Sequence, residues 1–325
     1  MTPTLIPQQP PANVAAHSKH HTPSNFGGHE DTVKAVAVFP DRRRMVTGLN
    51  DKTVRLWDLK TGAVLKKMEG HSSRVCALAV SRDGQIIASG DDGGELIAWH
   101  GEIGEPLTQL IKDHSKHISV DFSPDGTVLA ISSGMTVKFW CTKTWQMQGD
   151  PIECGYVRCV RYSPSGELLA IATSKDIQIY NPATRARVAS FRGHRDRNLS
   201  LAWTPDGIRL LSAGDDDDPT IREWDSSTWQ QVGQPWQGHT GYIWAIAMDP
   251  TGTLVASASH DKHVRLWRLS DRRNIGIFEH SSPPLSVTFS VDGRQILSGS
   301  YDKKISEWEV PEGTHAKASL HSALS

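Results

Sequence analysis

The sequence has no excess of charge of either sign. Its 325 residues contain 35 Lys plus Arg and 36 Asp plus Glu, which gives a formal net charge of −1 at pH 7. A chain without net positive charge has no overall field that would draw it toward nucleic acid or an anionic membrane surface. We therefore expect neither nucleic acid nor a membrane among its partners.

Cysteine is scarce, and no two cysteines form a C-x-x-C pair; they are Cys76, Cys141, Cys154 and Cys159. Small secreted domains need a denser disulfide framework than this. The N-terminal stretch MTPTLIPQQPPANVAAHSKHHTPSN also lacks the continuous apolar run of a signal peptide or membrane span. We expect a soluble intracellular protein of the cytoplasm, with the nucleus as the alternative.

Signatures of common enzyme classes are missing as well. The sequence contains no G-x-x-x-x-G-K-[ST] phosphate loop, no H-E-x-x-H zinc motif and no G-x-S-x-G nucleophile turn. We therefore predict that the protein is not an enzyme and that it carries no cofactor and no metal.

A repeat of about forty residues runs through the chain. The dipeptide GH, or its weaker forms DH and EH, recurs with its His at His29, His71, His114, His194, His239 and His280. One repeat between His114 and His194 lacks this His and has Cys154 in its place. A second series of aromatic residues has the same period and seven members: Trp57, Trp99, Trp140, Tyr180, Trp224, Trp267 and Trp308. Between them lie alternating runs such as VKAVAVF and LVASAS, separated by turns such as SPDG. This pattern predicts seven repeats of antiparallel strands.

The GH pair, followed at this period by the dipeptides Trp57-Asp58 and Trp224-Asp225, resembles the WD-repeat (β-transducin-type) family. The resemblance covers roughly residues 26–310. It implies an all-β fold, a seven-bladed β-propeller of four-stranded antiparallel blades. The segments IGEPL, GDPI and VGQPW further resemble repeats of fungal WD-repeat signalling proteins.

The same resemblance divides the chain into three parts. Residues 1–18 are expected to form a disordered arm, residues 19–310 the propeller, and residues 311–325 a C-terminal tail. The repeats are expected at about 28–69, 70–112, 113–153, 154–192, 193–237, 238–279 and 280–310.

In the family, an N-terminal segment supplies the outermost strand of the last blade and closes the ring. Residues of about 19 to 26 suit that place, because Phe26 lies three residues before His29, as Met68 lies before His71. The C-terminal segment HAKASLHS is the alternative, but it is small and polar.

The family also implies a buried hydrogen-bonded set of four side chains within one repeat: a His, a Ser or Thr, a turn Asp and a Trp. On matching positions these structural tetrads are His29, Thr47, Asp51 and Trp57; His239, Ser257, Asp261 and Trp267; and His280, Ser298, Asp302 and Trp308. Gly93 and Gly134 stand where other repeats have the turn Asp, and Tyr180 replaces Trp, so we expect blades two to four to be less stable. A catalytic Ser-His-Asp triad is the alternative explanation, but it is not expected to repeat along a chain.

Family members bind partners through residues around the mouth of the central channel, three and five residues after the repeat His and one before the turn Asp. Several residues at these positions are aromatic or basic, as in the hot spots of protein interfaces. The candidate partner-binding residues are Arg74, Tyr156, Arg158, Arg197, Tyr242, Trp244, His260 and Tyr301. We therefore predict a protein–protein interaction scaffold that binds a peptide or domain there, with Arg158 and Arg197 available to a carboxylate or phosphate. The alternative is that Tyr242 and Trp244 only pack against adjacent blades.

Two other functions stay open. In a small-ligand or metal-binding propeller, as sensor or enzyme, the acidic turn from Asp215 to Asp218 with His260 would be the site. A ubiquitin-ligase substrate receptor would carry a W-D-x-R motif, and the sequence has WDLK at Trp57 to Lys60.

Overall fold

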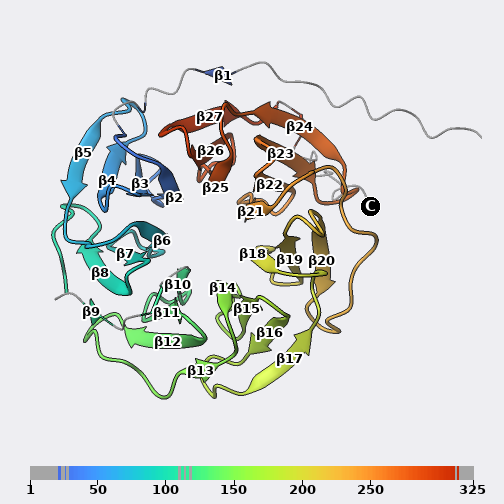
Figure 1. The fold of residues 1–325 in the computed structure, drawn as a ribbon, viewed down its shortest axis with the longest axis horizontal. Coiled ribbons are helices and arrows are strands. Elements are labelled where there is room, and N and C mark those ends of the chain that lie inside the picture. Colours follow the sequence, from blue (N-terminus) through green and yellow to red (C-terminus); the bar gives the residue numbers. More distant parts are fainter. Residues whose placement is uncertain are drawn as a thin grey trace, which may run out of the picture.

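The computed structural model describes residues 21–22, 26, 29–108, 111–112, 115–116, 119–311 and 313–314. The strands form seven antiparallel sheets, set as blades around a central axis (Figure 1). Within the described residues every regular element is a strand. The predicted all-β, seven-bladed propeller is thus confirmed. Residues 1–18 and most of 311–325, predicted to be the arm and the tail, lie outside the described residues.

Each blade is a meander whose innermost strand comes first. Blade 1 consists of β2 (Val33–Val38), β3 (Arg44–Leu49), β4 (Val54–Asp58) and β5 (Val64–Met68), and blade 2 of β6 (Val75–Val80), β7 (Ile86–Asp91), β8 (Glu95–His100) and β9 (Ile111–Lys112). Blade 3 consists of β10 (Val120–Phe122), β11 (Val128–Ser133), β12 (Thr136–Cys141) and β13 (Ile152–Glu153), and blade 4 of β14 (Val157–Tyr162), β15 (Leu169–Thr173), β16 (Ile177–Tyr180) and β17 (Arg187–Phe191).

The remaining blades follow the same order. Blade 5 consists of β18 (Asn198–Trp203), β19 (Arg209–Gly214) and β20 (Ile221–Asp225), and blade 6 of β21 (Ile243–Met248), β22 (Leu254–Ser259), β23 (His263–Arg268) and β24 (Asn274–Glu279). Blade 7 consists of β25 (Pro284–Phe289), β26 (Gln295–Ser300), β27 (Ile305–Glu309) and β1 (His21–Thr22).

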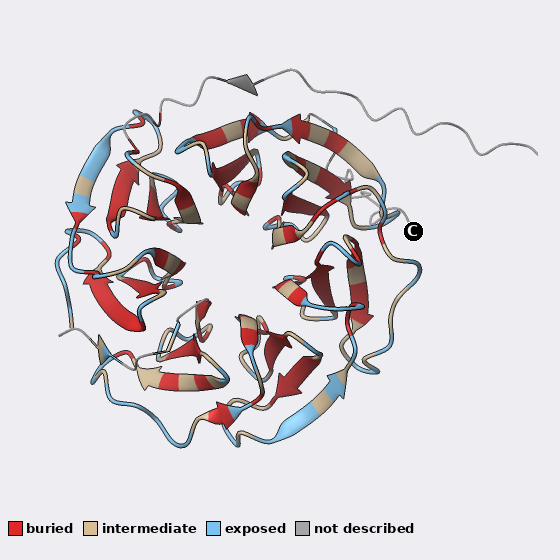
Figure 2. Ribbon diagram, viewed as in Figure 1, coloured by how far each residue is buried: buried red, intermediate tan, exposed pale blue. Residues whose placement is uncertain are grey.

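The hydrophobic core lies between neighbouring blades. One cluster joins Phe39 and Leu56 of blade 1 to Val75 and Trp99 of blade 2. Another joins Phe278 of blade 6 to residues of blade 7. Figure 2 shows the buried residues concentrated on the inner and middle strands, whereas the outer strands β5 and β17 are largely exposed. A single blade has too little apolar surface for a core of its own, so each blade is stabilised by its neighbours.

The innermost strand of most blades has a β-bulge at the same place. The pairing with the second strand shifts between Val33 and Ala35 in blade 1, and at the corresponding position in blades 2, 4, 5, 6 and 7. A bulge leaves one residue without a cross-strand partner and turns its side chain away from the regular alternation. The residues at these bulges are Lys34, Cys76, Arg158, Leu199, Trp244 and Leu285.

Blade 5 differs from the predicted four strands, since only three strands form its sheet. Its fourth position makes two isolated bridges, one of them between Ile221 and Trp236, which directly follows Pro235. Proline also interrupts this position in blades 2 and 3, at Pro106 and Pro151, where β9 and β13 have two residues each. Because proline has no N–H to donate to a ladder, it shortens the outer strand.

The ends of the ring meet between blades 7 and 1. Strand β1 pairs with β27, with His21 opposite Trp308 and Thr22 opposite Glu307. Phe26 is 3% exposed and belongs to a core cluster that includes Trp57 of blade 1 and Ile305 of blade 7. Closure of the ring by the N-terminal segment stays a prediction, which the Phe26 variant described below tests.

Candidate functional site

The residues of the predicted tetrad in blade 6 lie together. His239 Nδ1 is 2.7 Å from Asp261 Oδ2, and His239 Nε2 is 2.7 Å from Ser257 Oγ, which accepts a hydrogen bond of 2.8 Å from Trp267 Nε1. The bonds are mutually consistent when Nδ1–H donates to Asp261 and the Ser257 hydroxyl donates to Nε2. Burial lowers the pKa of His239, which favours this neutral tautomer.

Blades 2 and 5 contain equivalent networks that the sequence analysis did not name. In blade 5, His194 contacts Asp218 and Ser212, and Trp224 Nε1 donates to Ser212 Oγ. In blade 2, His71 Nδ1 lies 3.3 Å from Asp91 Oδ2, and Ser89 Oγ bridges His71 and Trp99.

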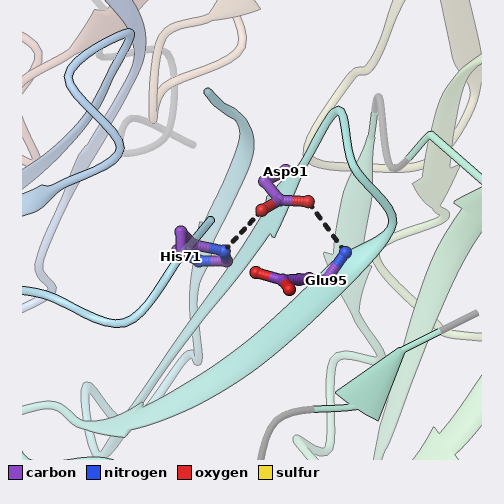
Figure 3. A group of neighbouring side chains, drawn as sticks. All are labelled: His71, Asp91 and Glu95. Carbon is purple, nitrogen blue, oxygen red and sulfur yellow. Dashed lines mark hydrogen bonds and ion pairs between the residues drawn. The ribbon is translucent and has the colours of Figure 1, made fainter. Parts of the chain in front are cut away.

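The inference that blade 2 lacks its acidic partner is therefore wrong. Asp91, two residues before Gly93, takes the place of the turn Asp (Figure 3). Its pKa is lowered to about 2, because the hydrogen bond from His71 and the backbone N–H of Glu95 outweigh burial, which alone would raise it.

His71, Asp91 and Glu95 form the one group of three possible metal ligands within 4.8 Å of one another in the described part of the chain. Figure 3 shows the three side chains converging. Their donor atoms are already engaged, however: His71 with Asp91 and Ser89, and Glu95 with the Ser72 N–H and Lys112. The group therefore acts as a structural hydrogen-bond network.

Blade 4 replaces the network with different residues. Tyr180 donates its hydroxyl to Gln178 Oε1 at 2.8 Å, and Gln178 Nε2 donates to the carbonyl of Cys154 and to Asp176. Cys154 stands where the other repeats have His, so Gln178 links this end of the blade to its turn through the amide instead.

In blade 7, the predicted tetrad consists of His280, Ser298, Asp302 and Trp308, and several of its contacts are present. His280 Nε2 lies 2.9 Å from Ser298 Oγ, and the His280 ring meets the Trp308 ring edge to face at 4.6 Å. Asp302 accepts the hydroxyl of Ser281.

In blade 1, His29 and Asp51 form no hydrogen bond with each other, although the carboxylate acts electrostatically on the imidazole. Trp57 Nε1 donates to Thr47 Oγ1 at 2.9 Å as in the other blades, but His29 stacks on Trp57 at 4.4 Å and neither of its nitrogens has a hydrogen-bond partner. Asp51 instead accepts hydrogen bonds from Thr53 and Arg55. The nearby Arg55 draws the carboxylate away from the imidazole.

Mild acid is expected to destabilise the protein through His29. Burial, with Arg55 nearby, lowers its pKa from 6.5 to about 4. Between those values the unfolded chain binds a proton that the folded chain does not, so stability falls as the pH decreases through this window. We expect His29→Gln to reduce the loss of unfolding free energy between pH 7 and pH 4 by more than about 1 kcal/mol. Urea unfolding of wild type and variant across this pH range measures the difference. Curves of unfolding free energy against pH that run parallel for the two proteins would contradict the prediction.

At the channel mouth, the bulges place side chains from six blades around one cavity. The cavity has a volume of about 310 Å³ and is lined by all six bulge residues, together with residues such as Arg161, Ser286 and Tyr301. The mouth residues predicted five positions after the repeat His are thus the bulge residues. Their position followed from the repeat register, but the bulge could not be predicted because it depends on strand pairing.

Tyr156 and Arg158 form a pair at the mouth between blades 3 and 4. The Arg158 guanidinium lies over the Tyr156 ring, 4.9 Å from its centre, and Tyr156 is 40% exposed. Burial lowers the pKa of Arg158, and neighbouring Arg197 lowers it further. The cation–π contact with Tyr156 partly offsets the cost of burying this charge.

Blade 6 contributes an aromatic group made of Tyr242, Trp244 and His260. The Tyr242 and Trp244 rings stack with centres 5.2 Å apart, and His260 meets Tyr242 edge to face at 5.5 Å. Tyr242 and Trp244 are half-buried, and Trp244 lines the cavity. The rings therefore do pack on each other, and they present part of their surface at the mouth.

Arg197 and the acidic turn neutralise one another. Arg197 Nε lies 3.4 Å from Asp196 and 4.0 Å from Asp215, and Asp216 accepts the Tyr242 N–H at 2.9 Å. Burial, and then the hydrogen bond with Asp196, raises the pKa of Asp215 to about 6. Asp218 belongs to the blade 5 network. Most of this turn therefore serves internal contacts.

The last two predicted mouth residues belong to blades 2 and 7. Arg74 forms an ion pair with Asp92, with Nε at 2.9 Å. Tyr301 is 42% exposed and carries the Lys34 ammonium over its ring at 5.0 Å. Lys34 was not among the predicted binding residues, although its bulge position places it at the channel mouth.

The fold, the repeated His-Asp-Ser-Trp networks and the mouth define a WD-repeat protein, and the chain belongs to that family. The family described as "WD domain, G-beta repeat" matches residues 21–58, 62–100, 104–141, 185–225, 229–268 and 272–309, more than half of the chain. The unmatched interval contains β14 to β16, where Cys154 and Tyr180 replace the usual His and Trp.

Relatives include the Serine-threonine kinase receptor-associated protein of Gallus gallus, 23% identical over 283 residues that cover 87% of this chain and 79% of that protein. The Ribosome biogenesis protein WDR12 homolog of Nematostella vectensis is 29% identical over 303 residues, 89% of this chain and 68% of the relative. Transcription factor unc-37 of Caenorhabditis elegans is 25% identical over 266 residues, 76% of this chain and 42% of the relative. The chain spans less than half the length of several of its relatives.

Among the residues that the structure describes, no helix has the length and apolar character needed to cross a bilayer.

Proposed function

We propose that this WD-repeat propeller is a non-catalytic scaffold that binds a peptide or domain of another protein on the channel mouth, near blades 4 to 7. The supporting observation is that Arg158 and Trp244 line one cavity. Tyr156 lies against Arg158, and Tyr242 stacks on Trp244. Tyr, Trp and Arg supply most of the binding energy in protein interfaces. A rigid ring holds them in place, so binding costs little ordering of the scaffold.

The absence of catalysis is supported by the burial of the network hydroxyls. Ser89, Ser212 and Ser257 are each 0% exposed, and each is hydrogen-bonded to His and Trp. A serine nucleophile has to reach a substrate carbonyl beside an oxyanion hole. These serines cannot do so without unfolding of their blades.

The named relatives support a scaffold in a second way. Their names refer to receptor association, ribosome biogenesis and transcription, which differ widely although all three match the same repeats. Function in this fold is therefore a matter of displayed surface residues. For this protein we propose the cytoplasm, or alternatively the nucleus, as the compartment. The geometry gives no support to a metal site in the acidic turn, because Asp215, Asp216 and Asp218 have protein partners.

An affinity pull-down from native cell extract tests the proposal. We expect a folded Tyr242→Ala, Trp244→Ala, Arg197→Ala triple variant to lose partners that the wild type retains. The control is a triple variant of exposed residues on the opposite face, Arg82→Ala, Ile103→Ala and Ile208→Ala, which lie in turns between the first and second or third and fourth strands. Identical partner sets for wild type and the mouth variant would contradict the proposal.

A further inference from the structure

A hydroxyl residue with arginines five and three positions before it occurs three times in the sequence, in residues 42–47, 185–190 and 195–200. This pattern, R-x-R-x-x-[ST], suits protein kinases that select basic substrates, because acidic subsites on such a kinase bind the two guanidinium groups. Thr47 is 0% exposed and Ser200 is 5% exposed, so the fold buries two of the three hydroxyl residues. Ser190 is exposed, which leaves it as the accessible member of the set.

Ser190 lies on strand β17, the outer strand of blade 4. Within the described residues no strand pairs with the outer edge of β17, so its extended backbone is open on that side. Arg187, Val188 and Ser190 are exposed, and the other two residues of the strand are half-buried. An edge strand with so little buried surface opens locally at a lower free energy than the strands beneath it. We therefore expect a kinase to reach the hydroxyl without unfolding of the blade.

The Ser190 hydroxyl donates a hydrogen bond of 2.9 Å to Asp176 Oδ2. Asp176 also accepts the Thr173 hydroxyl at 2.6 Å and the Gln178 amide at 2.9 Å. Burial alone would raise the pKa of Asp176, but the hydrogen bonds from Thr173, Gln178 and Ser190 hold it below its ordinary value. The carboxylate is therefore charged at neutral pH, and it is the shared acceptor of the network that blade 4 has in place of the His network.

A phosphate on Ser190 would act directly on this carboxylate. It removes the proton that Asp176 accepts and adds a charge of about −1.5 to −2 at the same place. The two anions repel each other, so the contact between the outer strand and Asp176 is lost. Gln178 also donates to the Cys154 carbonyl, so a displaced Asp176 disturbs the link between the turn and the entry of the blade.

We propose that Ser190 is phosphorylated by an arginine-directed serine kinase, and that the phosphate loosens blade 4 by repelling Asp176. In this reaction Ser190 Oγ attacks the γ-phosphorus of ATP. The new Oγ–P bond forms as the bond from that phosphorus to the departing ADP oxygen breaks, and the hydroxyl proton passes to a base of the kinase. The inference goes beyond the proposed function and does not depend on it.

Phosphorylation is tested on the full folded chain with Mg²⁺-ATP and a purified arginine-directed kinase, which is first shown to modify a synthetic peptide of residues 185–193. We expect a single phosphate, located at Ser190 by mass spectrometry. Ser190→Ala should remove the incorporation, and Arg187→Gln should slow it about tenfold or more. Lys175→Gln is the matched control, because it removes an exposed positive charge from the turn between β15 and β16, and it should leave the rate unchanged.

Urea unfolding of the phosphorylated and unphosphorylated protein tests the consequence for blade 4. We expect phosphorylation to lower the unfolding midpoint. In Asp176→Asn, which keeps an oxygen acceptor but no charge, phosphorylation should shift the midpoint by about half as much or less. Each shift is measured within one variant, so the effect of the substitution itself on stability does not enter.

Three results would overturn the inference. The first is no phosphate at Ser190 with a kinase that modifies the peptide, and the second is incorporation that Lys175→Gln slows as much as Arg187→Gln. The third is an unfolding midpoint that phosphorylation leaves unchanged or raises. None of these measurements involves a binding partner, so their outcome is independent of the pull-down that tests the proposed function.

Discussion

Replacing Phe26 by Ala is expected to lower the free energy of unfolding by about 3 to 5 kcal/mol, the usual cost of removing a buried phenyl ring. The ring of Phe26 is 3% exposed and meets Trp57 edge to face at 6.1 Å. The same cluster contains Leu297 and Ile305 of the last blade. Phe26 therefore fills the joint between the first and last blades, and its loss leaves a cavity where the ring closes.

Denaturant unfolding followed by tryptophan fluorescence measures this loss. Leu65→Ala is the control, because Leu65 lies on outer strand β5 and is 52% exposed, so its truncation should cost no more than about 0.5 kcal/mol. A loss below about 1 kcal/mol for Phe26→Ala would show that the N-terminal segment does not hold the ring together.

Asp261→Ala is expected to destabilise the protein by about 1 to 3 kcal/mol, because it leaves buried His239 without the acceptor for its Nδ1–H. The carboxylate also accepts backbone N–H bonds from Thr240 and His263. Burial alone would raise the pKa of Asp261, but the hydrogen bond from His239 holds it below its ordinary value. The charged carboxylate is thus tied to the entry of strand β21.

A double-mutant cycle with His239→Ala isolates the contribution of the pair. The control is Asp271→Ala, because Asp271 lies in an exposed turn of the same blade and pairs with Arg268 at 3.1 Å. Exposed ion pairs contribute between zero and about 1 kcal/mol. An unchanged unfolding midpoint in Asp261→Ala, or a cycle without coupling, would show that the network is not a source of stability.

The architecture could be predicted from the sequence because each blade repeats the same spacing. Trp57, Trp224 and Trp267 mark the third strand of their blades, and the alternating runs before them form the first two strands. Periodicity of this kind depends only on the order of residue types. The missing fourth strand of blade 5 was not predicted, although the proline in VGQPW is the signal that could have indicated it.

The hydrogen-bond networks were less predictable, since they depend on where a side chain turns within its local pairing. Gly93 occupies the expected aspartate position, yet Asp91 reaches His71 from two residues earlier. His29 has all its expected partners in sequence, yet Arg55 holds Asp51. A sequence match fixes which residues are near one another, but not which of two competing partners an oxygen accepts.

The candidate binding residues show the same limit. Their position at the mouth followed from the repeat register, whereas the distinction between Arg197 and Arg158 did not. One arginine is paired with carboxylates and the other is not, and this difference arises from the folded surroundings. Lys34, five residues after His29, could have been included on register alone.

The prolines that shorten the outer strands of blades 2, 3 and 5 also affect how molecules meet one another. An exposed outer strand offers a row of unpaired amides on which a second chain can add a strand and start aggregation. Proline removes such a donor, and the full-length outer strands β5 and β17 carry Lys66, Lys67 and Arg187 instead. Much of the circumference of the ring is thereby protected against edge-to-edge self-association.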